Sequence, residues 1–256
     1  MLKHPELTLQ RIQLFATQRG LVNKLYTQSA PVKLAVYHAP DRITYDEAMK
    51  GDYQPAQVGQ QFGPFWSTHW FRVEIDIPAA WAGKEVHFLW DSTSEATVWE
   101  NGSPMQGLAG SGNSWGTPGA IRPEYILTRS AKGGESLVLY VEMAVNNLFG
   151  LGVALDPAHL AQIGTLRQAE IAVFDREAWD LLWDFRVIAD MAQHLPANTP
   201  RKGQALYTAN EMINRIDLED RSTWAYARDC AKEFFAAKNG DGQLNLSAIG
   251  HAHIDT

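Results

Sequence analysis

The chain has 256 residues, and its 29 acidic and 22 basic side chains give a formal net charge of −7 at pH 7. Its single cysteine, Cys230, excludes a disulfide-built domain, and a mildly acidic chain without a basic stripe is not expected to bind nucleic acid. No apolar run is long enough to span a membrane and the first residues lack a secretory signal, so we expect a cytoplasmic protein with no membrane partner.

The first part of the chain is predicted to be helical. Apolar side chains recur there at close to helical spacing, and Pro5 suits a first helical turn. We therefore expect a helix from Pro5 to about Gln28, within an N-terminal segment of residues 1–29. Farther along, Thr44 and Glu47 have the spacing of a capping box that opens a short helix.

Residues 30–165 carry the pattern of an antiparallel β-sandwich. The segment from Trp70 to Pro78 alternates apolar and mostly charged side chains, as a strand with one buried face does. Its apolar face carries Phe71, Val73, Ile75 and Ile77. Asn101-Gly102 predicts a tight hairpin turn, because both residues tolerate positive φ. Further strands are predicted at 86–90, 96–100 and 137–145, and the last is apolar enough to be central.

Tryptophan is concentrated in this region. Six of the nine tryptophans fall within fifty residues, namely Trp66, Trp70, Trp81, Trp90, Trp99 and Trp115. Most of them lie in strand patterns, which favours places in the core over a sugar-binding platform. The glycine-dense stretch 107–119 lacks the lysine and the helix that a phosphate loop needs, so it is predicted to be a connection.

Residues 166–240 are predicted to be mainly helical, after a strand at 167–174. Three apolar stripes at helical spacing define three helices. The first stripe is Trp179, Leu182, Trp183, Val187, Asp190 and Met191, the second spans 206–216 and the third spans 224–235. We expect the tryptophans of these helices to lie in the core.

Residues 241–256 differ in kind. A short strand is predicted at 243–250, and it leads directly into His-Ala-His-Ile-Asp-Thr. In an extended chain the side chains of His251, His253 and Asp255 project to one side. Imidazole and carboxylate groups suit zinc and neighbouring divalent metals. The residue types alone leave a metal half-site and a polar chain end equally open, because these donors do not close a coordination set.

The segment Gly250 to Thr256 resembles the opening motif of the family 38 glycoside hydrolases, the class II α-mannosidases, and especially their cytosolic branch. The resemblance extends over the whole chain. It implies an α+β fold, in which an N-terminal helix, a jelly-roll-like sandwich and a helical segment precede the first strand of an α/β-barrel catalytic domain at 241–256. It also implies that His253 and Asp255 bind a divalent metal, Zn²⁺ first and Co²⁺ second, and that His251 orients them.

The same resemblance implies a retaining α-mannosidase that hydrolyses terminal α-mannosides of oligosaccharides. Retaining hydrolysis needs two carboxylates about 5 to 5.5 Å apart. In this family both the nucleophile and the acid/base would lie beyond Thr256, so no catalytic residue is expected within this chain and the chain alone is predicted to be inactive. His253 and Asp255 would then position sugar hydroxyls through the metal. A homo-oligomer is a further expected partner.

Two other hypotheses remain open from the residues. One is an amidohydrolase-type metal hydrolase, whose His-x-His pair also ends a first barrel strand; more metal-binding histidines downstream would favour it. The other is a carbohydrate-binding or assembly module, because the tryptophan-dense sandwich resembles the accessory jelly rolls of glycosidases.

Overall fold

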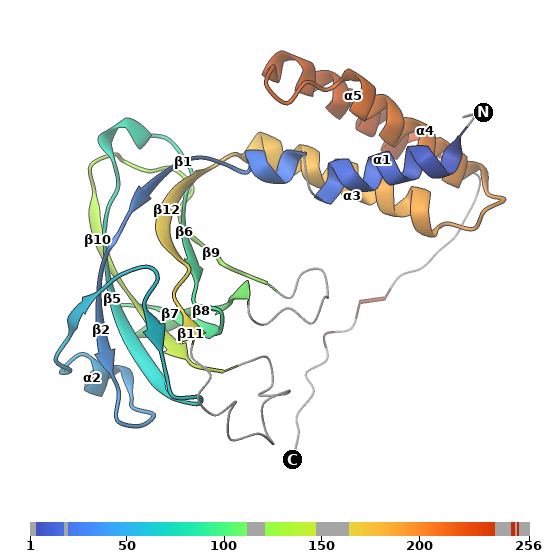
Figure 1. Ribbon diagram of the computed structural model, residues 1–256. Coiled ribbons are helices and arrows are strands. Elements are labelled where there is room, and N and C mark those ends of the chain that lie inside the picture. Colours follow the sequence, from blue (N-terminus) through green and yellow to red (C-terminus); the bar gives the residue numbers. More distant parts are fainter. Residues whose placement is uncertain are drawn as a thin grey trace. The chain divides into compact units, whose positions relative to one another are not determined.

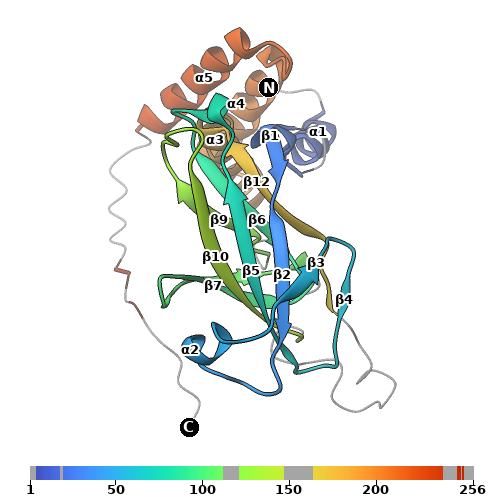
Figure 2. The same ribbon diagram turned by 90° about the vertical axis from the view of Figure 1, so that its left-hand side faces the viewer.

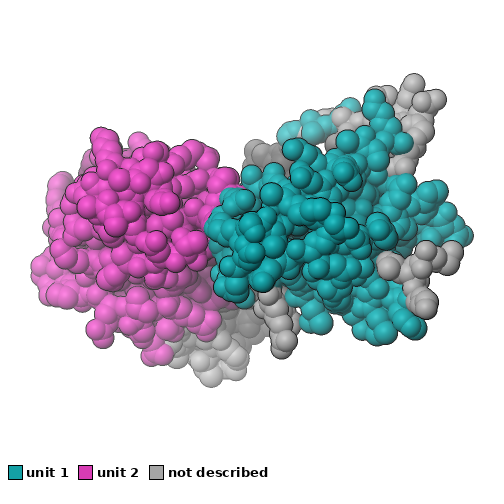
Figure 3. Space-filling view, turned by 90° about the horizontal axis from the view of Figure 1, so that it is seen from above, with its two compact units in different colours: residues 1–24, 177–256 teal, residues 25–176 magenta. Residues whose placement is uncertain are grey.

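The computed structural model describes residues 4–17, 20–111, 121–146, 164–238, 247–248 and 250. The chain divides into two units (Figure 3). Residues 25–176 form the sandwich unit, which is built mainly from strands, and residues 1–24 with 177–256 form the helical unit.

The sandwich unit contains two antiparallel sheets (Figures 1 and 2). The larger sheet has the strand order β3-β2-β5-β10-β7-β8, the smaller has β1-β12-β6-β9, and β11 pairs with β4. The strands are β1 Tyr26–Pro31, β2 Lys33–His38, β3 Gln54–Ala56, β4 Gln61–Phe62, β5 Thr68–Asp76, β6 Val86–Asp91, β7 Glu95–Glu100, β8 Ser103–Ala109, β9 Glu124–Thr128, β10 Ser136–Ala144, β11 Gly164–Thr165 and β12 Gln168–Phe174. The expected antiparallel sandwich is therefore confirmed.

The core of this unit is made by side chains from both sheets. Phe71 and Val73 of β5 are fully buried in one cluster with Phe88 and Trp90 of β6. The rings of Phe71 and Trp90 meet edge to face, with their centroids 4.9 Å apart. The apolar face predicted for this strand is confirmed, and β10 lies between β5 and β7 as its apolar sequence predicted.

The hairpin turn and the helix start predicted from short sequence motifs are also confirmed. Asn101 and Gly102, with φ of 50° and 83°, form the turn between β7 and β8. Helix α2 (Tyr45–Ala48) opens with the predicted capping box: the Thr44 N–H donates to Glu47 Oε2 at 2.8 Å, and the Glu47 N–H donates to Thr44 Oγ1 at 3.4 Å.

The outward face of β5 departs from simple alternation. Trp70 points to that face, yet it is fully buried. Tyr45 of α2 lies edge-on to its ring and stacks on Trp99 of β7 at a centroid distance of 5.5 Å. Helix α2 thus covers this part of the sheet. A small aromatic cluster therefore lies on the outer face, where the alternation of the sequence predicts side chains exposed to solvent.

The ends of the sandwich unit are set by strand pairing. Strand β1 pairs with β12, with Ser29 opposite Ala172. The unit consequently begins at residue 25 and ends at 176, whereas the sequence suggested 30 and 165. The strand expected ahead of the helices is part of the smaller sheet.

The helical unit contains α1 Pro5–Thr17, η1 Leu21–Lys24, α3 Arg176–His194, α4 Pro200–Arg215, η5 Arg221–Thr223 and α5 Trp224–Ala236. The prediction that the first helix continues to Gln28 is wrong. At Gly20 the chain passes so close to the Phe15 carbonyl oxygen that an added Cβ would meet it at 2.0 Å. Glycine allows this close approach after the helix, and β1 has begun by Tyr26.

The predicted inner face of α3 is confirmed at Leu182, which is buried, but is wrong for Trp179, Trp183 and Val187. Its buried residues are Ala178, Leu181, Leu182, Phe185, Ile188, Ala189 and Ala192. Trp179, Trp183 and Val187 are exposed, whereas Trp224 of α5 is buried as predicted. Apolar residues occur on two sides of α3, and packing against the neighbouring helices, such as that of Phe185 on Phe15 of α1, determines which side is buried. None of the helices in the described residues is long and apolar enough to cross a membrane.

Candidate functional site

The predicted metal ligands His253 and Asp255 and the orienting residue His251 lie outside the described residues, as does most of the strand predicted at 243–250. Their chemistry fits the group that the motif implies, because imidazole nitrogens and a carboxylate oxygen are good ligands for Zn²⁺. In the described part of the chain, no group of three or more His, Cys, Asp or Glu side chains could hold a metal ion. The metal site therefore stays a prediction.

A histidine relay lies at one end of the larger sheet. His38 of β2 and His69 of β5 are cross-strand partners, and their Nδ1 atoms are 2.9 Å apart. His69 Nε2 is 2.8 Å from Ser67 Oγ. The Ser67 hydroxyl in turn donates a hydrogen bond to the Pro64 carbonyl oxygen at 2.6 Å. Because the Ser67 hydroxyl proton already takes part in the hydrogen bond to Pro64, Ser67 Oγ must accept from His69 Nε2–H. His69 Nδ1 is then unprotonated and accepts a hydrogen bond from His38 Nδ1–H.

The relay is built around a neutral imidazole. His69 is only 2 % exposed, and burial together with the nearby His38 lowers its pKa to about 4. A serine nucleophile needs a neighbouring base that accepts its proton. Here Ser67 gives its proton to a backbone carbonyl and accepts one from His69, so the group orders a turn and does not activate a nucleophile.

A second cluster surrounds Glu85, close to the start of α3. Its carboxylate accepts hydrogen bonds from Arg176 at 2.6 Å and from His87 Nε2 at 3.1 Å, and Arg129 lies 3.5 Å away. Burial raises the pKa of Glu85, but the hydrogen bonds from Arg176 and His87 outweigh it and bring the pKa below its ordinary value. The carboxylate is therefore ionised and fully engaged at neutral pH.

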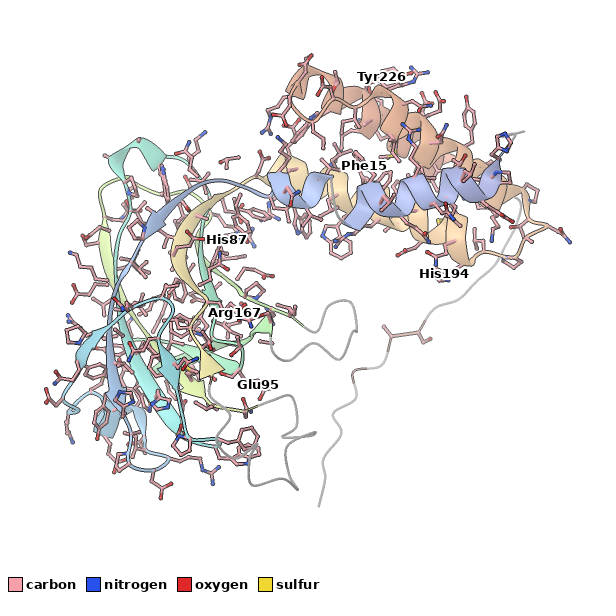
Figure 4. The ribbon with its side chains drawn as sticks, in the orientation of Figure 1. Phe15, His87, Glu95, Arg167, His194 and Tyr226 are labelled. Atoms are coloured by element: carbon pink, nitrogen blue, oxygen red, sulfur yellow. The ribbon has the colours of Figure 1, made fainter. Side chains whose placement is uncertain are left out.

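His87, labelled in Figure 4, completes this cluster. Its Nδ1 accepts from the Tyr26 hydroxyl at 3.2 Å, and its ring stacks on Phe174 at 4.2 Å. Burial lowers the pKa of His87 despite the nearby Glu85 carboxylate. Hydrogen bonds and ring stacking through His87 thus link β1, β6 and β12, and the cluster has a structural role.

Neither cluster was predicted from the sequence. His38 and His69 are 31 residues apart, and Glu85 and Arg176 are 91 apart, so only the strand register brings each pair together. The one local signal was that Glu85 directly precedes the strand predicted at 86–90 and is two residues from His87, so extended backbone there places both on one face.

The comparison with protein families decides the assignment. Residues 30–172 match the family described as "Alpha-mannosidase, jelly roll domain". The chain belongs to this α-mannosidase family. The resemblance drawn from the terminal motif is thereby confirmed at the level of the family.

Whole-chain relatives agree. α-Mannosidase 2C1 of Homo sapiens is 41% identical over 268 residues, covering 100% of this chain and 25% of that protein. α-Mannosidase G of Dictyostelium discoideum is 36% identical and covers 100% of this chain and 24% of that protein. An α-mannosidase of Saccharomyces cerevisiae is 31% identical over 84% of this chain and 20% of its own length. The chain spans about a quarter of the length of these relatives.

Among solved structures, a β-glucuronidase from Ruminococcus gnavus in complex with D-glucuronic acid gives a TM-score of 0.41 at 18% identity. The alignment covers 57% of this chain and 29% of that one.

Proposed function

We propose that this chain is the N-terminal part of a metal-dependent retaining α-mannosidase that removes terminal α-mannosyl residues from oligosaccharides. The observation that carries the proposal is the alignment with α-mannosidase 2C1, which covers 100% of the chain at 41% identity. That alignment runs through the sandwich, the helices and the terminal motif, so it does not depend on the short motif alone.

In this proposal His253 and Asp255 hold a divalent metal, with Zn²⁺ as the first candidate and Co²⁺ as the second. A bound metal of this kind supplies positive charge that holds sugar hydroxyls in place. The His253 imidazole and the Asp255 carboxylate act only as ligands, and His251 orients them. The nucleophile and the acid/base belong to the sequence that follows in the longer relatives.

The sandwich unit is proposed to have an accessory role. The expectation that most of its tryptophans are core residues is confirmed for Trp70, Trp81 and Trp90, which are buried. Trp99 is partly covered by Tyr45, and Trp66 is exposed. Trp115 lies outside the described residues. Among the described tryptophans of this unit, one exposed indole offers little of the stacked aromatic surface that a sugar platform uses, which supports the enzyme hypothesis over a carbohydrate-binding module. The family assignment likewise disfavours an amidohydrolase.

We also propose a cytoplasmic location, which the resemblance of the terminal motif to the cytosolic branch of the family supports. Assembly into a homo-oligomer and the lack of nucleic-acid binding stay predictions.

The test compares this 256-residue chain with the longer protein that its relatives lead us to propose. Both are assayed with an aryl α-mannoside and with the matching aryl β-mannoside, after removal of metal and after addition of Zn²⁺ or Co²⁺. We expect the longer protein to hydrolyse only the α-anomer, with retention and only with metal, and the short chain to be inactive. Failure of the metal-loaded long protein to cleave α-mannosides, or turnover by the short chain, would contradict the proposal.

A further inference from the structure

An apolar stripe lies exposed along α3. It consists of Trp179, Trp183 and Val187, which we call the tryptophan stripe, and these side chains are 37%, 45% and 43% exposed. Successive members are four residues apart, so they lie on one side of the helix. With a rise of about 1.5 Å per residue, the stripe extends roughly 12 Å along the axis.

This stripe lies opposite the side of α3 that packs in the helical unit. Residues of an α-helix advance by about 100° each, which puts Trp183 on the far side from the buried residues Leu181 and Phe185. Phe185 meets Phe15 of α1 at a centroid distance of 5.1 Å. The described helices of this unit therefore bury the other side of α3 and leave the stripe facing outward.

Ion pairs connect one flank of α3 to α5. Arg228 of α5 lies 3.1 Å from Asp184 and 3.5 Å from Asp180. Burial raises the pKa of Asp184, although Arg228 acts in the opposite direction. These ion pairs place α5 beside this flank of α3, and the tryptophan stripe stays exposed.

The composition of the stripe is that of a protein interface. The rings of Trp179 and Trp183 meet edge-on with centroids 5.9 Å apart, and the Arg186 guanidinium lies 5.3 Å from the Trp183 ring. Tryptophan and arginine are enriched at the centres of interfaces, where they contribute much of the binding energy. Asp190 and His194, at the far end of the helix (His194 labelled in Figure 4), give the stripe a polar margin.

We propose that the tryptophan stripe is the docking surface for the catalytic region that follows α5 in the longer α-mannosidases. The inference rests on the proposed function, because it takes the chain to be part of such a protein. Three quarters of the human relative lie outside the alignment, while α3 itself lies within it. The helical unit follows the jelly-roll match at 30–172 and precedes the predicted catalytic strand at 241–256, so it is next in sequence to that partner.

The same polypeptide is favoured over a second copy by effective concentration. A region tied to α5 by a short stretch of chain meets the stripe at an effective concentration on the order of millimolar. Two separate copies must instead overcome the entropy of association. A small stripe can therefore bind stably within one polypeptide.

Hydroxyl-radical footprinting tests this directly. The oxidation rates of Trp179 and Trp183 are measured in this chain and in the long protein, at several protein concentrations and with an added peptide to normalise the radical dose. We expect several-fold slower oxidation in the long protein, independent of concentration. Equal rates in the two proteins would overturn the inference. Protection that grows with concentration in the short chain would also overturn it, because a second copy would then be the occupant.

A pair of variants separates docking from folding. Trp183→Asp is compared with Tyr207→Asp, which changes an exposed aromatic residue on α4 of the same unit. We expect Trp183→Asp to lower the unfolding temperature of the long protein by several degrees and to leave that of the short chain almost unchanged, with a smaller effect from Tyr207→Asp. Equal destabilisation of both proteins by Trp183→Asp would show a purely structural role. Footprinting and melting need no activity, so they can succeed even if the proposed mannosidase activity fails.

Discussion

The Nδ1 atoms of His38 and His69 lie 2.9 Å apart across the β2–β5 pair, and this distance allows only one proton between them. Ser67 has already committed its hydroxyl proton to the Pro64 carbonyl, so His69 must donate through Nε2 and accept through Nδ1. A protonated His69 would carry an N–H at Nδ1 as well, so His38 would have to change tautomer and accept there. The arrangement with a neutral His69 needs no such change, in agreement with the low pKa of His69.

We expect the sandwich unit to lose stability as the pH falls from 6.5 to about 4. Unfolded His69 takes up a proton near its ordinary pKa of 6.5, whereas folded His69 does so only near a pKa of about 4. The unfolded state then binds more protons throughout this window, so the free energy of unfolding decreases with falling pH. The contribution is fully present above pH 6.5, and its loss is at most about 3 kcal/mol. Urea unfolding followed at several pH values across the window measures it.

The control for this prediction is a pair of histidine variants. His69→Gln should flatten the pH profile, with a remaining slope from His87, whose pKa burial also lowers. His4→Gln changes an exposed residue just before α1 and should keep the wild-type slope. An unchanged slope in His69→Gln would show that the relay does not govern acid sensitivity.

Signals confined to a few residues were predictable from the sequence. Asn101-Gly102 defined its turn because the backbone conformation needs residues that tolerate positive φ, and Thr44 with Glu47 defined a helix start because both hydrogen bonds are local. Strand alternation likewise identified the inward face of β5. Each of these depends on interactions within one element or one turn.

Features that depend on distant segments were not predictable. Trp70 is buried on the outer face of β5 only because α2 folds over it, and no pattern within β5 reports that cover. Trp183 was expected in the core because α3 has apolar residues on two sides, and only the neighbouring helices determine which side is buried. The assignments of His253 and Asp255 rest on a motif, and they remain predictions.

Glu85→Ala is expected to destabilise the sandwich unit by about 1 to 3 kcal/mol, because it leaves the buried His87 Nε2–H without its acceptor and removes the ion pair with Arg176, whose side chain is 41% exposed. Glu74→Ala is the matched control. Glu74 pairs with Arg72 on the exposed face of β5, where an ion pair contributes roughly 0 to 1 kcal/mol. Thermal unfolding of the two variants measures the difference, and equal effects would show that the Glu85 cluster adds nothing beyond a surface pair.

Two nearby glycines should respond oppositely to alanine. At Gly110 a Cβ would lie 2.7 Å from both Asp91 Oδ1 and the Thr93 backbone nitrogen, which belong to a hydrogen-bonded turn that cannot shift freely. Gly110→Ala should therefore cost at least about 2 kcal/mol. At Gly107, within β8, no atom lies within 4 Å of the added Cβ. Gly107→Ala should be neutral or stabilising by about 0.5 to 1 kcal/mol, since it reduces the freedom of the unfolded chain. Similar denaturant midpoints for the two variants would contradict this contrast.

The last prediction separates the roles within the terminal motif. In the longer protein, His253→Ala and Asp255→Ala should each remove bound metal and activity, because loss of one ligand opens the coordination set. His251→Ala should be milder, since a residue that only orients ligands costs about 10 to 100-fold in affinity or activity. Added Zn²⁺ should therefore partly rescue His251→Ala and leave the other two variants without metal.

Metal content after gel filtration is the deciding measurement, because it reports binding even where activity is lost for another reason. In the 256-residue chain all three variants should resemble the unchanged chain, as two ligands cannot hold a divalent ion tightly against water. If His251→Ala of the longer protein lost its metal while His253→Ala retained it, the ligand assignment would be reversed. His251 would then be a metal ligand, as in the amidohydrolase-type pair. The proposed metal site would have to include His251 in place of His253.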